Sequence, residues 1–355
     1  MINPTPHIGA MAPYALADLG PEGAVSMAQN ESAFAPSPLA LAAGQAALAQ
    51  AALYPDPDWI DLRAAIARVH QLDAGRILCG AGSMELIGAL ISAFSGPGDE
   101  VLGSQFGYAY VATACQLSQS RYVTAPELDL VVSPTEILAR VTPATRIVFV
   151  CNPGNPTGTT IANADLVALR RDLPDDVLLV IDQAYGEFAD PLDDPACLFA
   201  LVDLGNTIIT RSFSKAYALA GVRVGWAYAP DRIGSEIRKV LNPNNVSIIS
   251  QQMARGAIED QAHLSGIVAR TGALRTAFST QCRALGLHVP PSQTNFALMQ
   301  FGSAEDARRA DQALRRHGLM MRGMGGYGLS DCLRATICDQ TVMDRAVAVL
   351  KGVLT

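Results

Sequence analysis

The sequence is poor in charged and aromatic residues, which limits the partners that the protein can have. Only 17% of its 355 residues are charged, 6% are aromatic, and the formal net charge is -7. A chain of this balance lacks the basic surface that nucleic acid or an anionic membrane requires. We therefore expect neither nucleic acid nor a membrane among its partners.

Sequence patterns that are typical of disulfide-linked or metal-binding proteins are also missing. The seven cysteines are scattered singly without a Cys-x-x-Cys pair, and the five histidines are isolated. An odd number of cysteines in a long chain argues against a disulfide framework, and no zinc-type ligand spacing occurs, so we expect no metal. The first residues lack the basic start and apolar core of a signal peptide. A reducing compartment fits best, and we expect a cytoplasmic protein.

Half of the residues are hydrophobic, which is enough for a large buried core and more than one domain. Short β-rich runs alternate with helical patterns between about residues 76 and 235. This alternation predicts an α/β fold with a mostly parallel central sheet and helices on both faces. The predicted strands are Arg76–Cys79, Glu100–Leu102, Arg146–Val150, Val177–Ile181, Thr207–Arg211 and Gly225–Ala229, and the predicted helices are Met84–Phe94, Ala109–Leu117 and Ala162–Arg171.

The last third of the chain has a different pattern. From near Ala262 it predicts a helix, short strands around Thr294–Phe301 and Cys332–Ile337, and a closing helix Val342–Leu350. We expect a smaller α+β domain here. The predicted division is 31–261 for the large domain, with 1–30 and 262–355 forming the small one.

Unusual polar residues follow three of the predicted strands. Arg146–Val150 runs into an Asn-Pro-Gly-Asn-Pro-Thr-Gly segment, Val177–Ile181 into Asp-Gln-Ala-Tyr, and Thr207–Arg211 into Ser-Phe-Ser-Lys with Arg223 eight positions beyond the lysine. Each segment alone has an ordinary explanation as a turn, a helix cap or core. Ligands of open α/β sheets bind outside the carboxyl ends of the strands. Together, the three segments therefore indicate one site.

Lys215 is the residue on which the functional prediction depends. An amine placed between hydroxyls at a strand end can form a Schiff base with an aldehyde cofactor, and the nearby Ser212, Ser214 and Arg223 can hold a phosphate. A lysine taken at random is more often a solvent-facing residue of a polar loop. The turn Gly80–Leu86 between a strand and a helix adds backbone amides that favour a phosphate.

These three motifs resemble those of the fold-type I pyridoxal-phosphate aminotransferases, and the resemblance runs from about Asn30 to Leu350. Within that group the chain is most similar to the histidinol-phosphate aminotransferases. The residues that carry this likeness are Asn30-Glu31, Pro36-Ser37-Pro38, Tyr54-Pro55-Asp56, Leu62-Arg63, Gly82-Ser83, Thr294-Asn295-Phe296, Arg322 and Tyr327–Arg334. The resemblance implies the fold of type I pyridoxal-phosphate transferases.

The resemblance also implies a role for each matching position around the cofactor, pyridoxal 5'-phosphate. Lys215 would hold the cofactor and then transfer protons, and Asp182 would pair with the pyridinium nitrogen. Asn155 and Tyr185 would bind the phenolic oxygen. Tyr108 would stack on the ring, although Phe106 and Tyr110 lie close by. The expected phosphate-binding residues are Gly82, Ser83, Met84, Ser212, Ser214 and Arg223.

Two further groups of residues follow from the likeness. Tyr54 would reach the phosphate from the partner subunit, which implies a homodimer with shared active sites. Arg334 and Arg322, with Tyr14 and Asn295 nearby, would bind the amino donor and the 2-oxo acid acceptor, because a planar guanidinium suits carboxylate and phosphate. For Arg322 a surface salt bridge is the alternative.

The implied activity is transfer of an amino group between histidinol phosphate and 2-oxoglutarate. Departures from the family pattern leave alternatives open: Ser32-Ala33 follow Asn30-Glu31, Met84 follows Ser83, and Ile337-Cys338-Asp339 ends the last motif. These departures do not touch the cofactor chemistry but do concern the substrate. The alternatives are an aromatic amino acid or another amine as substrate, decarboxylation, and a cofactor-binding protein without catalysis.

Overall fold

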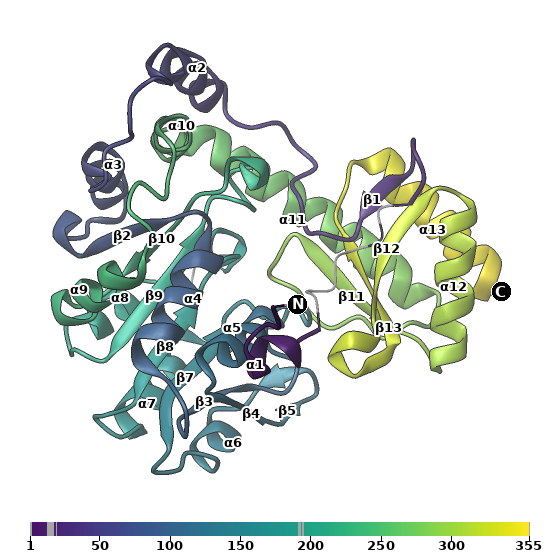
Figure 1. The fold of residues 1–355 in the computed structure, drawn as a ribbon. Coiled ribbons are helices and arrows are strands. Elements are labelled where there is room, and N and C mark those ends of the chain that lie inside the picture. The colour runs from purple at the N-terminus through teal and green to yellow at the C-terminus, as the bar shows by residue number, and fades with distance from the viewer. Residues whose placement is uncertain (1, 13–17, 19, 191–192, 194, 355) are drawn as a thin grey trace.

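The computed structural model describes residues 2–12, 18, 20–190, 193 and 195–354. They form two units, each built around its own sheet and hydrophobic core (Figure 1). The larger sheet has seven strands in the order β2 (Ile77–Gly80), β10 (Gly225–Tyr228), β9 (Thr207–Ser212), β8 (Leu178–Asp182), β7 (Thr145–Cys151), β3 (Glu100–Ser104) and β4 (Arg121–Ala125).

The larger sheet is parallel except at one strand. β10 runs antiparallel to both of its neighbours, and every other pair is parallel. Every residue of β8 and β9 is buried, as expected for strands covered by helices on both faces. The prediction of a mostly parallel α/β sheet is therefore confirmed. β4 was not predicted, because its Arg-Tyr-Val-Thr-Ala sequence forms a half-exposed edge strand without a continuous apolar run.

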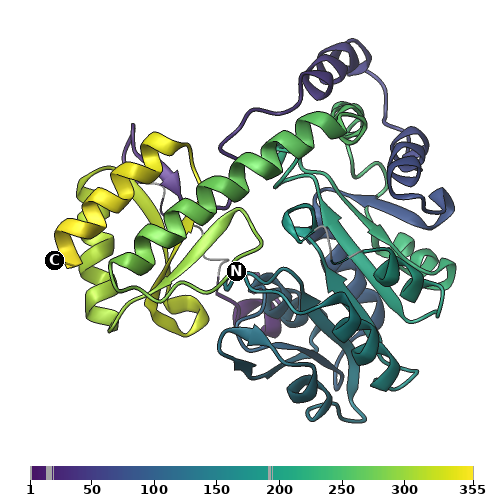
Figure 2. The same ribbon diagram turned by 180° about the vertical axis from the view of Figure 1, so that it is seen from behind.

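Helices cover both faces of this sheet (Figures 1 and 2). α4 illustrates why they form: Leu86, Ile87, Leu90 and Ile91 recur at helical spacing and are buried. The helices of the larger unit are α2 (Pro38–Ala47), α3 (Ile60–His70), α4 (Ser83–Phe94), α5 (Tyr110–Ser118), α6 (Pro134–Leu138), α7 (Asn163–Asp172), α8 (Ala196–Val202), α9 (Asp231–Val240) and α10 (Ile248–Glu259). Of these, α2 packs mainly against α10. A short hairpin joins β5 (Glu127–Leu128) and β6 (Val131–Val132).

The smaller sheet has four strands in the order β1 (Val25–Met27), β12 (Leu319–Met324), β13 (Leu329–Thr336) and β11 (Phe296–Gln300). α11 (Gln261–Ala284), α12 (Ala304–Arg316) and α13 (Gln340–Leu354) belong to this unit. α11 extends from the larger unit to the smaller one, so it connects them physically (Figure 2). It begins next to the predicted domain boundary, which remains a prediction.

The first thirty residues do not belong to a single unit. β1 pairs with β12 of the smaller sheet, whereas α1 (Pro6–Gly9) contacts α5 of the larger unit. The assignment of 1–30 to the small domain remains a prediction, and within it β1 and α1 contact different units. Between these elements and α2, residues 28–37 run along the junction of the two units, and we call this segment the strap.

Candidate active site

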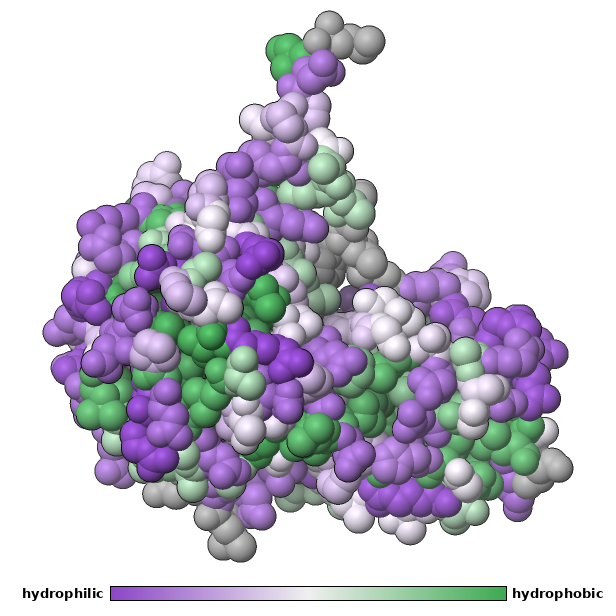
Figure 3. Space-filling view, turned by 90° about the horizontal axis from the view of Figure 1, so that it is seen from below, coloured by the Kyte–Doolittle hydropathy of each residue, from purple (hydrophilic) through white to green (hydrophobic). Residues whose placement is uncertain are grey.

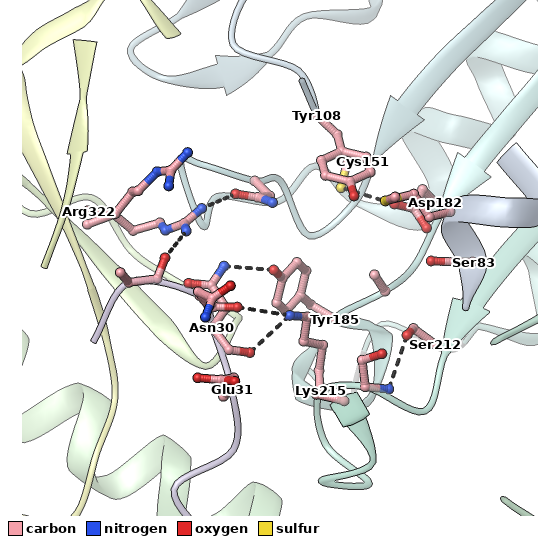
Figure 4. Close-up of a pocket in the computed structure, with 18 of the residues that line it drawn as sticks. Asn30, Glu31, Ser83, Tyr108, Cys151, Asp182, Tyr185, Ser212, Lys215 and Arg322 are labelled. Atoms are coloured by element: carbon pink, nitrogen blue, oxygen red, sulfur yellow. Dashed lines mark hydrogen bonds between the residues drawn. The ribbon is translucent and has the colours of Figure 1, made fainter. Parts of the chain in front are cut away.

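A cavity of about 390 Å³ lies between the two units, at the carboxyl ends of β7, β8 and β9. Figure 4 shows its wall. The residues that line it are Ala28, Gln29, Asn30, Glu31, Ser83, Met84, Tyr108, Cys151, Asn155, Asp182, Ala184, Tyr185, Ser212, Ser214, Lys215, Ala220, Gly221, Arg223, Arg322, Tyr327 and Arg334. The three motifs that follow β7, β8 and β9 thus meet in one place.

Asp182 is the last residue of β8 and is almost completely buried. Its Oδ1 accepts a hydrogen bond of 2.7 Å from the Thr210 hydroxyl, and its Oδ2 lies 3.8 Å from the Cys151 thiol. Burial raises the pKa of Asp182 to about 6, and the hydrogen bonds from Thr210 and Cys151 oppose this rise. A buried carboxylate of this kind favours a cationic partner, which would restore its charge.

Lys215 follows β9 and points toward the strap (Figure 4). Its Nζ donates to the carbonyl of Asn30 at 3.0 Å and to that of Gln29 at 3.3 Å. Burial, together with the nearby cations Arg334 and Arg223, lowers the pKa of Lys215 to about 8, and the Glu31 carboxylate opposes this fall. An amine with this pKa is partly neutral near pH 7 to 8, so it can act as a nucleophile or a base.

Four residues at the centre of the cavity form two hydrogen-bonded pairs. The Tyr185 hydroxyl accepts from Asn30 Nδ2 at 2.8 Å, and the Asn155 Oδ1 accepts from Arg334 Nη1 at 2.5 Å. The Tyr185 ring also packs edge-on against Phe296, with 5.3 Å between centroids. Burial raises the pKa of Tyr185, so it remains a neutral hydroxyl.

Among the three aromatic residues that precede and begin α5, Tyr108 lies on the cavity wall. Phe106 packs instead against a small cluster that contains Leu298 and Met324. The Tyr110 hydroxyl lies close to Gly88 of α4. Tyr108 is therefore the one of these three that lines the cavity, and its stacking on a ring stays a prediction.

The residues expected around a phosphate converge at the N-terminus of α4. Ser83 begins this helix, and Gly82 before it has a φ of +83°. A Cβ on Gly82 would lie 2.5 Å from Arg223 Nη2, so the arginine lies directly against the turn. The Arg223 Nη1 is 3.4 Å from Ser214 Oγ. A helix N-terminus beside a guanidinium and hydroxyls is suited to a phosphate.

Gly225 makes this arrangement possible, and the sequence analysis missed it. A Cβ on Gly225 would lie 2.2 Å from the Ser83 backbone nitrogen, which cannot move without displacing the helix N-terminus. Glycine therefore allows β10 to approach the phosphate-binding turn. A glycine inside a predicted strand is a known sign of close backbone approach, so the signal was present.

Arg322 and Arg334 lie directly opposite each other on β12 and β13. Both line the cavity, and Figure 4 places Arg322 across it from Asp182 and Ser83. Arg334 is 6% exposed, and its Nη2 donates to the Ala28 carbonyl at 2.9 Å. The smaller sheet thus supplies two cations to a cavity whose other wall carries Lys215.

Several predicted residues do not reach the cavity wall. Asn295 is buried, and its Nδ2 donates to the carbonyls of Asn30 and Glu31 at 3.0 and 3.1 Å, so it holds the strap rather than facing the cavity. Gly82 directly precedes Ser83 but does not itself line the cavity. Tyr54 is 86% exposed and does not line the cavity. Tyr14 lies outside the described residues.

The strap contributes residues to which the sequence analysis gave no role. Asn30 has a φ of +55°, its backbone N–H donates to Thr336 Oγ1 at 2.9 Å, and its side chain reaches Tyr185. Cys151 and Tyr327 also line the cavity. Asn30 was part of the family motif, but its partners lie 155 and 306 residues away in the sequence. No local pattern could identify them.

The part of the chain that the structure describes holds neither a metal-binding cluster nor a membrane-spanning helix. No cluster of three or more His, Cys, Asp or Glu side chains there is arranged to hold a metal ion. No helix there has the length and apolar character that crossing a bilayer requires.

Comparison with known sequences gives consistent matches along the chain. A family model described as aminotransferase class I and II matches residues 22–350. Histidinol-phosphate aminotransferase of Paramagnetospirillum magneticum is 42% identical over 359 residues, which cover 99% of both chains. The enzyme of the same name from Hyphomonas neptunium is 40% identical over 356 residues, covering 99% of this chain and 97% of the relative.

Solved structures give the same result. Histidinol-phosphate aminotransferase from Sinorhizobium meliloti in complex with pyridoxal-5'-phosphate has a TM-score of 0.92 and 30% identity, and the match covers 100% of this chain and 98% of that one. A mutant of Thermus thermophilus aspartate aminotransferase has a TM-score of 0.87 at 20% identity, covering 99% and 100%. At that identity the second likeness shows the fold alone.

Proposed function

Since the chain belongs to the family of class I and II aminotransferases, we propose that it transfers an amino group between histidinol phosphate and 2-oxoglutarate. Its cofactor is pyridoxal 5'-phosphate. The observation that carries the choice of substrate is the full-length identity of about 40% to relatives with this activity in their names. The opposed arginines Arg322 and Arg334 support it, because both the phosphate of one substrate and the carboxylates of the other need cations.

The residues of the cavity fit this cofactor. The turn at Gly82 and Ser83, with Arg223 against it, would hold the phosphate. The buried Asp182 carboxylate would pair with the ring nitrogen, and Lys215 has the lowered pKa that covalent attachment requires. These three groups come from different strand ends and line one cavity of about 390 Å³.

When bound, pyridoxal 5'-phosphate supplies an aldehyde that amines can attach to and a cationic ring that withdraws electrons. Lys215 Nζ would first hold the cofactor and then, once the substrate amine has replaced it, take up and return the proton of the substrate carbon. A pKa near 8 suits both tasks at neutral pH. The carbonyls of Gln29 and Asn30 would orient the free amine.

The remaining polar groups would fix the ring and keep its charge. Thr210 and Cys151 hold the Asp182 carboxylate from two sides, so it would be kept in place to pair with the ring nitrogen. Tyr185 and Asn155 would bind the phenolic oxygen. Their partners Asn30 and Arg334 hold both side chains in place before any substrate binds.

We assign the two arginines to different parts of the substrates. Arg334 is buried and tied to Asn155, so we place it at the substrate group next to the reacting carbon, the α-carboxylate of glutamate. Arg322 lies across the cavity from Asp182, so we place it at the far end, on the phosphate or the second carboxylate (Figure 4). One site would then accept both substrates in alternate half-reactions.

A homodimer is part of the proposal. The end of the molecule around α2 and α3 carries a group of exposed large hydrophobic residues, namely Leu39, Leu41, Leu48, Leu53, Tyr54 and Ile60. Such a group is typical of a contact surface. The opposite end, seen from below in Figure 3, mixes hydrophilic and hydrophobic residues. Tyr54 is exposed within this group, which supports our proposal that it reaches the cofactor phosphate of the partner subunit.

The compartment that we propose is the cytoplasm. All seven cysteines belong to the described residues, and each is a free thiol. Free thiols are typical of a reducing environment.

The substrate assignment is tested by comparing donors. We expect kcat/KM for histidinol phosphate to exceed that for phenylalanine, with 2-oxoglutarate as acceptor. Arg322→Ala should lower kcat/KM for histidinol phosphate by about 10- to 100-fold, because a charge-assisted contact to the phosphate is lost. Phenylalanine, which carries no distal anion, serves as the internal control and should change little.

Two outcomes would contradict this assignment. A preference of the unchanged enzyme for phenylalanine would make it an aromatic aminotransferase, and release of carbon dioxide from an amino acid would make it a decarboxylase. Equal losses for both donors in Arg322→Ala would reject Arg322 as the phosphate anchor.

A further inference from the structure

β9 contacts the end of β8 through two consecutive residues that point to opposite faces of the sheet. Thr210 donates to the Asp182 carboxylate on one face. Arg211, the next residue, holds the turn that follows Asp182. Because β9 itself leads into Lys215, contacts between these two strand ends determine where Asp182 and Tyr185 lie relative to the lysine.

The guanidinium of Arg211 is surrounded by this turn. Its Nη2 donates to Gln183 Oε1 at 2.9 Å, and its Nη1 lies 3.4 Å from Glu187 Oε1. A Cβ on Gly186 would lie 3.3 Å from the Arg211 Cζ, so the chain wraps closely around the cation. The segment that carries Tyr185 is therefore held on both sides of that residue, at Gln183 and at Glu187.

The surroundings of the guanidinium restrict it further. Its Cζ lies 5.4 Å from the centroid of the Phe199 ring and 5.9 Å from that of Trp226. The side chains of Arg211 and Glu187 are only 5% and 6% exposed. An ion pair buried to this extent costs desolvation energy and is weak evidence for stability alone. Its geometry therefore needs another explanation.

We propose that Arg211 is a positioning residue, whose forked guanidinium fixes the turn 183–187 so that Asp182 and Tyr185 meet the cofactor held by Lys215. This rests on the proposed function only in requiring bound pyridoxal 5'-phosphate, not a particular substrate. Arginine is needed because a lysine offers one point of charge instead of a planar fork and cannot hold Gln183 and Glu187 together.

The test compares Arg211→Lys with a matched control, Arg170→Lys. Arg170 is also buried, at 6% exposure. Its guanidinium donates to four carbonyls, those of Leu173, Pro174 and Val177 just before β8 and that of Asn206 just before β9. It is thus a forked, buried arginine at the far end of the same strand. A loss of thermal stability that comes only from weaker packing should be similar in both variants.

The main measurement is the pH titration of the visible absorbance of bound pyridoxal 5'-phosphate. A hydrogen bond from Tyr185 to the phenolic oxygen stabilises the unprotonated form of the bound cofactor. If Tyr185 is displaced, the pH at the midpoint of the absorbance titration should therefore rise, by about one pH unit. In Arg211→Lys we expect this shift together with a kcat that falls by about 10- to 100-fold. In Arg170→Lys we expect a lower Tm with the wild-type midpoint and kcat.

An unchanged midpoint and a kcat within about twofold of wild type in Arg211→Lys would overturn the proposal. Should that variant not fold, Glu187→Gln keeps the side-chain shape and removes one anchor of the turn. It should shift the midpoint in the same direction by a smaller amount, and a wild-type midpoint there would overturn the proposal equally. Because the titration uses no amino donor, an error in the proposed substrate would leave its result intact.

Discussion

The two sheets contribute to the cavity in different ways. The seven-stranded sheet supplies residues at adjacent strand ends, where Asp182, Ser212 and Lys215 are held by short hydrogen bonds or by burial. The four-stranded sheet supplies Arg322 and Arg334 from two neighbouring strands. The first arrangement suits one invariant cofactor, whereas the second suits substrates that alternate. We infer that the larger sheet determines the chemistry and the smaller one the choice of substrate.

The largest effect that this comparison predicts comes from the larger sheet. Asp182→Asn keeps the side-chain shape but cannot hold the ring nitrogen cationic, so kcat should fall by about 100- to 1,000-fold for every donor. The measurement is kcat for histidinol phosphate and for phenylalanine in parallel. A loss of kcat confined to one donor would contradict our inference that the larger sheet determines the chemistry and the smaller one the choice of substrate.

The same variant should stabilise the protein once the cofactor has been removed. The folded-state pKa of Asp182, about 6, lies above its ordinary value of 3.8. Between these two pKa values the folded protein binds more protons than the unfolded chain. The contribution of protonated Asp182 to the free energy of unfolding is therefore fully present below about pH 4 and is lost as the pH rises to about 6. Above pH 6, Asp182→Asn should raise the free energy of unfolding by on the order of 2 kcal/mol, measured by denaturant titration.

Local patterns predicted this half of the site because each motif follows a buried strand directly. Asp182 and Lys215 lie where the apolar runs end, so the sheet brings them together. The edge strand β4 and the strands β1 and β12 were missed, because β1 has three residues and β12 reads Leu-Met-Met-Arg-Gly-Met without alternation. Their pairing depends on contacts between distant parts of the chain.

A second prediction concerns the close approach of β10 to the phosphate-binding turn. Gly225→Ala would place a Cβ 2.2 Å from the Ser83 nitrogen and displace the N-terminus of α4. We expect the Kd for pyridoxal 5'-phosphate to rise by about 10- to 100-fold, measured by equilibrium dialysis. Gly266→Ala in α11, where nothing lies within 4 Å, is the control and should bind normally. Equal affinity in both variants would refute the role of Gly225.

The smallest effect concerns Asn295, which the resemblance implied as a substrate contact. Its amide holds the strap carbonyls of Asn30 and Glu31, so Asn295→Ala should lower the free energy of unfolding by about 1–3 kcal/mol. We expect kcat/KM to fall by less than about tenfold and equally for all donors. A loss specific to histidinol phosphate would restore the original assignment.

Asn295 and Asn30 also show why part of the site escaped prediction. Both occur in family motifs, yet their side chains act on distant backbone or side-chain groups instead of on a ligand that chemistry alone would suggest. The resemblance implied Tyr108 in spite of two aromatic neighbours, and the structure places Tyr108 on the cavity wall while Phe106 and Tyr110 pack elsewhere. Residue type predicts what a side chain can bind, whereas the fold determines what it meets.

Covalent trapping at Lys215 tests the central claim most directly. Protein loaded with pyridoxal 5'-phosphate and reduced with borohydride should retain the cofactor on a single peptide, and mass spectrometry should locate it on the Lys215 side chain. The Lys215→Ala variant, treated in the same way, should release the cofactor on denaturation. Attachment at the chain's other lysines, or no retained cofactor in the unchanged protein, would contradict the account.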